Sequence, residues 1–273
     1  MEENRRVYPA DRRSGKALRY LLLFLSAVLI LSGLVWRGEE TAIEPVPQPT
    51  PISTSEAFDE TPAQREITLP ASTWYALQLG AFENEDAAQA LCRQFARRGA
   101  AGYVWQDGRY RALAATYPSR EDAQQVRLQL NRDHTVDSYL YEITLPQVQL
   151  RLRGMQGQLD ILEAAFLHAN DLVSGLQALS VSLDRQEQSA QEALAVMQGL
   201  KAQVETVSLR LQQRFAAPRP QTVSDLCALF DSYCAACNAS LPESAVALGV
   251  RIKWETLDVL RQLQQIYDSF TST

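Results

Sequence analysis

The longest apolar stretch of the chain runs from residue 20 to residue 36, between a basic N-terminal flank and an acidic C-terminal flank. It is short for a membrane-spanning helix, but Ala17 and Leu18 extend it past Arg19, whose long side chain can reach the membrane surface. The basic flank favours a cytoplasmic N-terminus. The pattern predicts a cytoplasmic tail at 1–16 and a transmembrane helix at 17–37; a cleaved signal peptide is the alternative.

Residues 38–70 contain six prolines, many Ser, Thr and Glu residues, and few large apolar side chains. Such a segment cannot bury enough surface to offset the entropy lost on ordering. The composition predicts a Pro-rich disordered linker that holds the folded part of the chain away from the membrane.

Between residues 71 and 145 the apolar pattern changes repeatedly between a period of two and a period of 3.6, and it predicts the order βαββαβ. Strands are expected at 74–79, 102–106, 109–115 and 138–143, and helices at 85–98 and after Ser119. Asn84 and Ser119 are expected to cap the helices, and Asp107-Gly108 to form a hairpin turn. Two helices would cover one face of a four-stranded antiparallel sheet and leave the other face open.

The alternation along the first and third strands places Trp74, Gln78, Arg109 and Arg111 on the open face. Aromatic rings stack on the apolar faces of sugars, while amide and guanidinium groups bond to hydroxyl and acetamido groups. An arginine can also pair with a carboxylate on a glycan. These four residues are therefore the candidate glycan-binding residues.

Two motifs in this region resemble the SPOR domain, a small module of bacterial cell-wall proteins. One is Gln78, Gly80 and Phe82, and the other is Tyr110-Arg111 followed by the helix start at 119–123. The resemblance implies a βαββαβ fold that binds glycan strands stripped of stem peptides, which accumulate at division septa. It implies that the groove lies on the open sheet face, with Gln78, Arg109 and Arg111 as the residues carried over.

The chain departs from this family at four positions. Leu113 stands where the family often has a second arginine, Ala115-Thr116 where Gly-Pro is usual, and Ala81 where some members have serine. Because these departures remove polar groups, they imply weaker or altered glycan contacts.

In the C-terminal region, apolar residues follow one another at alternating spacings of three and four from Leu152 to Leu183, and the pattern resumes after residue 190. It predicts one long helix or a helical hairpin at 147–217, with Asp184 and Glu187 as a capping box at the turn of the hairpin. Two further helices are expected at 221–270, which would complete a separate all-α bundle, partly coiled coil. This region would bind a protein partner or self-associate.

The net charge of −6 gives no electrostatic footprint for nucleic acid. The two histidines, His134 and His168, fall in different predicted regions, no nucleophile motif is present, and heptad helices offer no cleft for a carboxylate pair. The residues Cys227, Cys234 and Cys237 share one helix face, as buried apolar residues do, with a disulfide between the last two as an alternative. We therefore expect no catalysis, no metal and no cofactor.

The resulting prediction is an α+β, single-pass membrane protein that binds septal peptidoglycan outside the membrane, in division or sporulation. The alternative is a scaffold that works through its coiled-coil helices, with a degenerate SPOR-like spacer.

Overall fold

The computed structural model describes residues 61–134, 136–239, 242 and 244–271. The predicted cytoplasmic tail, the predicted transmembrane helix and residues 38–60 of the predicted linker lie outside this part of the chain. Among the helices that the structure describes, none is both long enough and apolar enough to cross a membrane.

The contacts divide the chain into two units, residues 1–54 and residues 55–273. Most buried apolar side chains of the described residues belong to two apolar clusters within the second unit. Because this unit closes its own core, we expect residues 55–273 to fold without the preceding residues.

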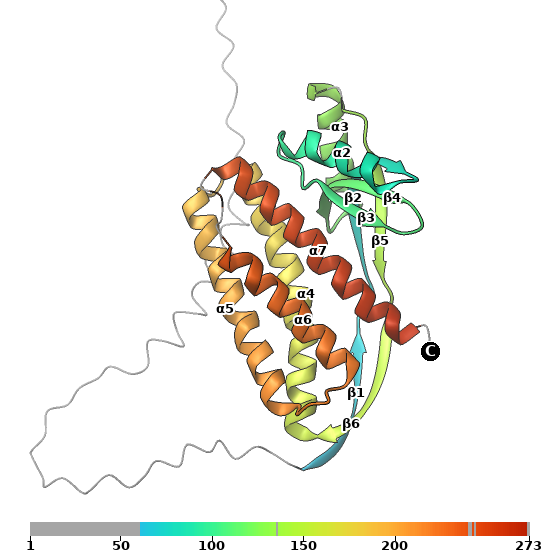
Figure 1. Cartoon of the computed structure of the whole chain (residues 1–273), viewed down its shortest axis with the longest axis vertical. Helices are drawn as coiled ribbons and strands as arrows, with labels where there is room; N and C mark the ends of the chain where they lie inside the picture. The colour runs from blue at the N-terminus through green and yellow to red at the C-terminus, as the bar shows by residue number, and fades with distance from the viewer. Residues whose placement is uncertain (1–60, 135, 240–241, 243, 272–273) are drawn as a thin grey trace, which may run out of the picture. The chain divides into compact units, whose positions relative to one another are not determined.

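A four-stranded antiparallel sheet and two helices follow the predicted order βαββαβ, which is confirmed (Figure 1). In chain order the elements are β2 (Ser72–Phe82), α2 (Glu85–Ala96), β3 (Tyr103–Gln106), β4 (Tyr110–Tyr117), α3 (Arg120–His134) and β5 (Tyr139–Leu145). The strands lie in the order β3-β4-β2-β5.

Local sequence signals explain where these elements begin and turn. The side chain of Asn84 accepts a hydrogen bond of 2.9 Å from the amide of Ala87 and caps α2. The hydroxyl of Ser119 accepts one of 3.0 Å from the amide of Asp122 at the start of α3. Gly108 has a φ of +86° in the turn between β3 and β4, a conformation that favours glycine.

A second, two-stranded sheet pairs β1 (Pro62–Leu69) with β6 (Val148–Met155). Leu69 lies opposite Val148 and Ser72 lies opposite Leu145, so this ribbon continues the register of the β2–β5 pair. The prediction of a disordered linker up to residue 70 is therefore wrong for 62–69, and that of a helix from 147 is wrong for 148–155. Prolines at 70 and 146 interrupt the ladder between the two pairs, because proline cannot donate a backbone hydrogen bond.

In the described part of the chain four helices follow β6: α4 (Gln156–Asp184), α5 (Ala190–Arg214), α6 (Gln221–Asn238) and α7 (Ala245–Thr271). The segment predicted as one long helix or a hairpin is a hairpin of α4 and α5. The predicted apolar seam of α4 is buried inside the bundle, at Leu159, Leu162, Phe166, Ala169, Val173, Leu176 and Leu183. The seam residues therefore pack against other helices of the same chain.

The capping box at this turn involves Ser189 and Glu192 instead of the predicted Asp184 and Glu187. The Ser189 hydroxyl accepts from the amide of Glu192 at 3.3 Å, and Glu192 Oε2 accepts from the amide of Ser189 at 2.8 Å. The Ser189 hydroxyl also donates to Glu192 Oε2 at 2.9 Å, and this bond and the one from the Ser189 amide lower the pKa of the Glu192 carboxyl. In the sequence, Ser189 and Glu192 follow Asp184 and Glu187 by five residues and have the same spacing of three.

Replacing Ser189 with alanine removes both hydrogen bonds of its hydroxyl, and we expect it to lower the free energy of unfolding by about 1 kcal/mol. Urea denaturation of residues 55–273 measures the effect. Ser174→Ala is the control, because among the described residues this exposed hydroxyl of α4 bonds only to the carbonyl of Asn170. Equal losses in the two variants would contradict a capping role for Ser189.

Candidate functional site

The sheet of the βαββαβ module separates two apolar layers. On the side of α2 and α3 lie Leu77, Ala114, Ala115, Tyr117 and Ala123, with Tyr75 and Leu79 packed against them. On the other side lie Trp74, Ala76, Tyr103, Trp105, Leu113, Ile143 and Leu145, which share one core with the helical bundle. Tyr75, Leu77 and Leu79 of β2 therefore face the two helices.

The predicted open face is wrong, because α7 packs on it against β3, β4 and β5 (Figure 1). The large apolar side chains of this face explain the difference. Trp105 is 1% exposed and Leu113 is completely buried, and burial of such side chains is favourable by roughly 1.5–3 kcal/mol each. A face of this composition is stable only when another apolar surface covers it.

Polar and aromatic contacts also hold α7 on the sheet. The hydroxyl of Tyr103 donates to Asp258 Oδ1 at 3.2 Å, and the Tyr103 ring meets the edge of Trp254 with centroids 5.3 Å apart. Burial, together with the negative charge of Asp258, raises the pKa of Tyr103. The guanidinium of Arg261 lies 5.0 Å from the centre of the Trp105 ring. The contact between α7 and the sheet is therefore specific.

Trp74 belongs to the covered part of this face. Its side chain is 8% exposed, and Trp74 lies opposite Ile143 of β5 inside the shared core. A sugar ring cannot stack on it in this structure. The prediction of Trp74 as an exposed sugar platform is corrected accordingly.

Two other predicted residues, Gln78 and Arg111, meet at an uncovered end of the same face. Arg111 Nη1 donates to Gln78 Oε1 at 2.8 Å, and Arg111 Nε donates to the two oxygens of Asp107 at 2.8 and 2.9 Å. Tyr141 donates its hydroxyl to Asp107 Oδ2 at 2.6 Å, and its ring lies 4.6 Å from the guanidinium of Arg111. We call Gln78, Asp107, Arg111 and Tyr141 the Arg111 cluster.

The charges of the cluster are stable near neutral pH. Burial raises the pKa of Asp107, but the hydrogen bonds from Tyr141 and Arg111 outweigh it and hold this pKa below its usual range. Burial and the bond to Asp107 raise the pKa of Tyr141 to about 12. The cluster therefore presents a carboxylate, a neutral phenol and a guanidinium.

The Arg111 cluster has unused hydrogen-bonding capacity. A guanidinium carries five N–H donors, and of those of Arg111 only Nε and one at Nη1 bond to described residues. Beside the cluster, Tyr139 lies opposite Gln78 on β5 and is 62% exposed. This combination of donors and an exposed ring is suited to a sugar.

Arg109, the remaining predicted site residue, lies outside the Arg111 cluster. Its side chain is exposed, and Nη2 donates to the carbonyl of Ala81 at 3.3 Å. Three residues at this end of the sheet are absent from the predicted site: Asp107, Tyr139 and Tyr141. The sequence predicts Asp107 only as part of the hairpin turn. The alternation of the two tyrosines along the last strand was visible in the sequence, but the face that they occupy depends on the register with β2.

Among the residues that the structure describes, no group of three or more His, Cys, Asp and Glu side chains is placed to hold a metal ion. Cys227, Cys234 and Cys237 of α6 are buried free thiols, as is Cys92. Burial raises the pKa of each. Thiols that are buried and protonated react slowly.

Comparison with known proteins adds a family to this geometry. Neither a curated protein nor a solved structure matches the chain. The family model of the SPOR domain matches residues 59–106 and 71–141, which cover β2 to α3, the start of β5 and the Arg111 cluster. The SPOR domain is a binding domain associated with septal peptidoglycan. Residues 59–141 of this chain therefore carry a SPOR domain, a module that suggests binding to peptidoglycan in cell division.

Proposed function

We propose that this chain is a single-pass membrane protein that binds peptidoglycan without catalysis and is enriched at the septum during division or sporulation. The anchor is the apolar stretch at 17–37, with the N-terminus in the cytoplasm and the SPOR domain outside. The ligand is the glycan strand stripped of its stem peptides, and the Arg111 cluster is the site that binds it. The single observation that carries this proposal is the pairing of Gln78 with Arg111 at the uncovered end of the sheet face.

The cover formed by α7 limits this site to a short stretch of glycan. Leu113, which stands where related domains often have arginine, is completely buried and lies opposite Tyr103 beneath α7. An arginine in this place would lose its hydration without a partner, at a cost of several kcal/mol. Leucine at position 113 is therefore consistent with a domain in which α7 covers part of the sheet face.

Removing Arg111 tests the site. We expect Arg111→Ala in residues 55–273 to reduce retention on amidase-stripped sacculi about tenfold, because a hydrogen bond to a charged group contributes roughly 1.5–3 kcal/mol. Gln78→Ala should act in the same direction. Arg132→Ala is the matched control, since Arg132 is exposed on α3 and, within the described part of the chain, pairs only with Asp133. Circular dichroism confirms that each variant is folded.

Two results would contradict the proposal. Folded Arg111→Ala that is retained as well as the unchanged protein would exclude the cluster as the glycan site. Equal retention on untreated and amidase-stripped sacculi would exclude the specificity for stripped strands.

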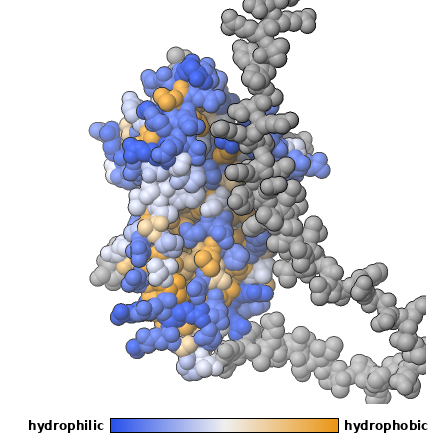
Figure 2. Space-filling model, turned by 180° about the vertical axis from the view of Figure 1, so that it is seen from behind, coloured by the Kyte–Doolittle hydropathy of each residue, from blue (hydrophilic) through white to orange (hydrophobic). Residues whose placement is uncertain are grey.

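A scaffold role for the helical region is the second candidate function, and the buried sheet face favours it. In addition, large apolar side chains of α4 and α5 are exposed, among them Leu167, Val196 and Leu209. Figure 2 shows apolar side chains among polar ones over the lower, helical part of the molecule. Where exposed apolar side chains form a contiguous patch, the patch is typical of a protein interface. In this case Leu167→Ser with Leu209→Ser abolishes septal localisation while Arg111→Ala leaves it unchanged.

A further inference from the structure

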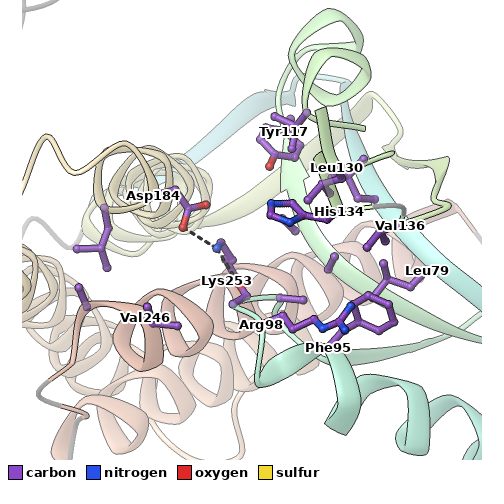
Figure 3. A pocket seen from close by; sticks show the side chains of 18 of the residues that line it. Leu79, Phe95, Arg98, Tyr117, Leu130, His134, Val136, Asp184, Val246 and Lys253 are labelled. Atoms are coloured by element: carbon purple, nitrogen blue, oxygen red, sulfur yellow. Dashed lines mark hydrogen bonds and ion pairs between the residues drawn. The ribbon is translucent and has the colours of Figure 1, made fainter. Parts of the chain in front are cut away.

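A cavity of about 700 Å³ lies on the side of the SPOR sheet opposite to the Arg111 cluster (Figure 3). Its floor is formed by Leu77 and Leu79 of β2 with Ala114 and Ala115 of β4. The walls come from α2 and α3, and the ends of α4 and α7 form its rim. Its size is within the range of sites that hold small ligands, roughly 300–1,000 Å³.

The cavity has a direct cause in the sequence. Strand β4 carries two alanines where it faces α2 and α3, so the sheet presents a low floor beneath the two helices. The adjoining side chains of α3, Val126 and Leu130, are only partly buried. A protein interior is normally packed without voids of this size, so the apolar lining is available to a ligand.

The mouth of the cavity is basic. Lys253 is 9% exposed, and its ammonium group donates to Asp184 Oδ1 at 2.7 Å and to the carbonyl of Gly99 at 2.8 Å. An ammonium group has three donors, so one remains for a ligand. The guanidinium of Arg98 lies 5.5 Å from the centre of the Phe95 ring, and both residues line the cavity, as does His134 (Figure 3). The lining of the cavity thus contains the basic side chains of Arg98 and Lys253 and the acidic side chain of Asp184.

We propose that this cavity binds the acyl chain of a single-chain amphiphile whose anionic head group contacts Arg98 and Lys253. The apolar lining matches an alkyl chain, which gains free energy by leaving water. The excess of positive charge at the mouth matches a carboxylate or a phosphate. This binding is independent of the proposed glycan site, which lies on the other face of the sheet.

The test titrates residues 55–273 with 11-(dansylamino)undecanoic acid and follows the rise in dansyl fluorescence. We expect saturable binding of one probe per chain. Unlabelled palmitate and palmitoyl-lysophosphatidic acid then compete, which distinguishes a carboxylate head from a phosphate head. Hexadecanol, which has the same chain length as palmitate and no charge, should compete at least about tenfold more weakly, as expected for the loss of a charge-assisted contact.

Variants locate the ligand. Ala115→Leu fills the cavity from the floor and Val126→Phe fills it from the wall, and either should abolish saturable binding while the circular dichroism spectrum stays unchanged. Arg98→Gln should weaken binding of the acid about tenfold and leave that of the alcohol unchanged. Arg93→Gln is the matched control, because Arg93 lies on the same helix, bonds to Gln89 and does not line the cavity.

Three results would overturn the proposal. The first is the absence of saturable binding by the unchanged protein. The second is binding that persists in both filled variants, which would place the probe elsewhere. The third is competition by hexadecanol as strong as that by palmitate and lysophosphatidic acid, which would exclude recognition of an anionic head.

Discussion

Replacing Trp105 with alanine is expected to destabilise the protein by about 3 to 5 kcal/mol, the usual cost of removing a large aromatic side chain from a core. Trp105 is 1% exposed and lies between the SPOR sheet and α7. It contacts the ring of Tyr141 with centroids 6.4 Å apart and the guanidinium of Arg261. The substitution leaves a cavity between the sheet and α7, and neither side can move to fill it without losing its contacts with the other.

Urea denaturation of residues 55–273 measures this loss, with the helical signal and tryptophan fluorescence followed in parallel. Trp254→Ala is the matched control, because Trp254 contacts the same sheet from α7 but is only partly buried. We expect a smaller loss for this variant. In Trp105→Ala both signals should change together, since the sheet and the bundle share one core. Two separate transitions would contradict this.

A shared core changes how the SPOR domain of this chain is understood. The sheet face that the resemblance assigned to glycan is mostly an internal surface, with Trp74, Trp105 and Leu113 beneath α7. A fragment cut at residue 145 would expose these side chains to water and tend to aggregate. Binding measurements on the isolated module would therefore describe a surface that the whole chain does not present.

The sequence predicts the SPOR module well because its signals are local. Asn84 and Ser119 are at the helix starts, Gly108 is in the turn, and the alternation of Tyr75, Leu77 and Leu79 assigns them to the helix side. Each of these signals depends on the geometry of a few neighbouring residues. They determine the βαββαβ order without knowledge of the remaining chain.

The features that the sequence did not predict depend on residues far apart. Whether the sheet face with Trp74 and Leu113 is open depends on α7, more than a hundred residues later. The pairing of β1 with β6 likewise joins residues from both sides of the module, and the prolines at 70 and 146 hide its continuity with β2 and β5. The Arg111 cluster needs Tyr141, whose face is determined by the register with β2.

The second large effect that we expect is a dependence of stability on pH, caused by Glu255 of α7. This side chain is 2% exposed, and burial raises the pKa of its carboxyl to about 7. The negative charge of Asp258 acts in the same direction, and Arg251, whose Nη2 lies 2.8 Å from Glu255 Oε1, opposes both. The pair lacks a well-directed hydrogen bond at this oxygen, so the ion pair does not offset the cost of burial.

The sign follows from proton binding. Between the ordinary glutamate pKa of about 4.3 and the folded value of about 7, the folded state binds more protons than the unfolded state. The contribution of Glu255 to stability therefore falls as the pH rises through this range. Glu255→Gln, which stays neutral, should stabilise the protein at pH 8 by about 2 to 3 kcal/mol more than it does at pH 5.

Urea denaturation of both proteins at pH 5 and pH 8 provides the measurement. Glu205→Gln is the matched control, because Glu205 pairs with Lys201 at the same helical spacing but is 61% exposed, so its removal should change stability little at either pH. A gain from Glu255→Gln that is the same at both pH values would show that the carboxyl is already charged at pH 5. In that case Arg251 and the surrounding groups would stabilise the charged carboxylate, and its burial would not cost the free energy that we assign to Glu255.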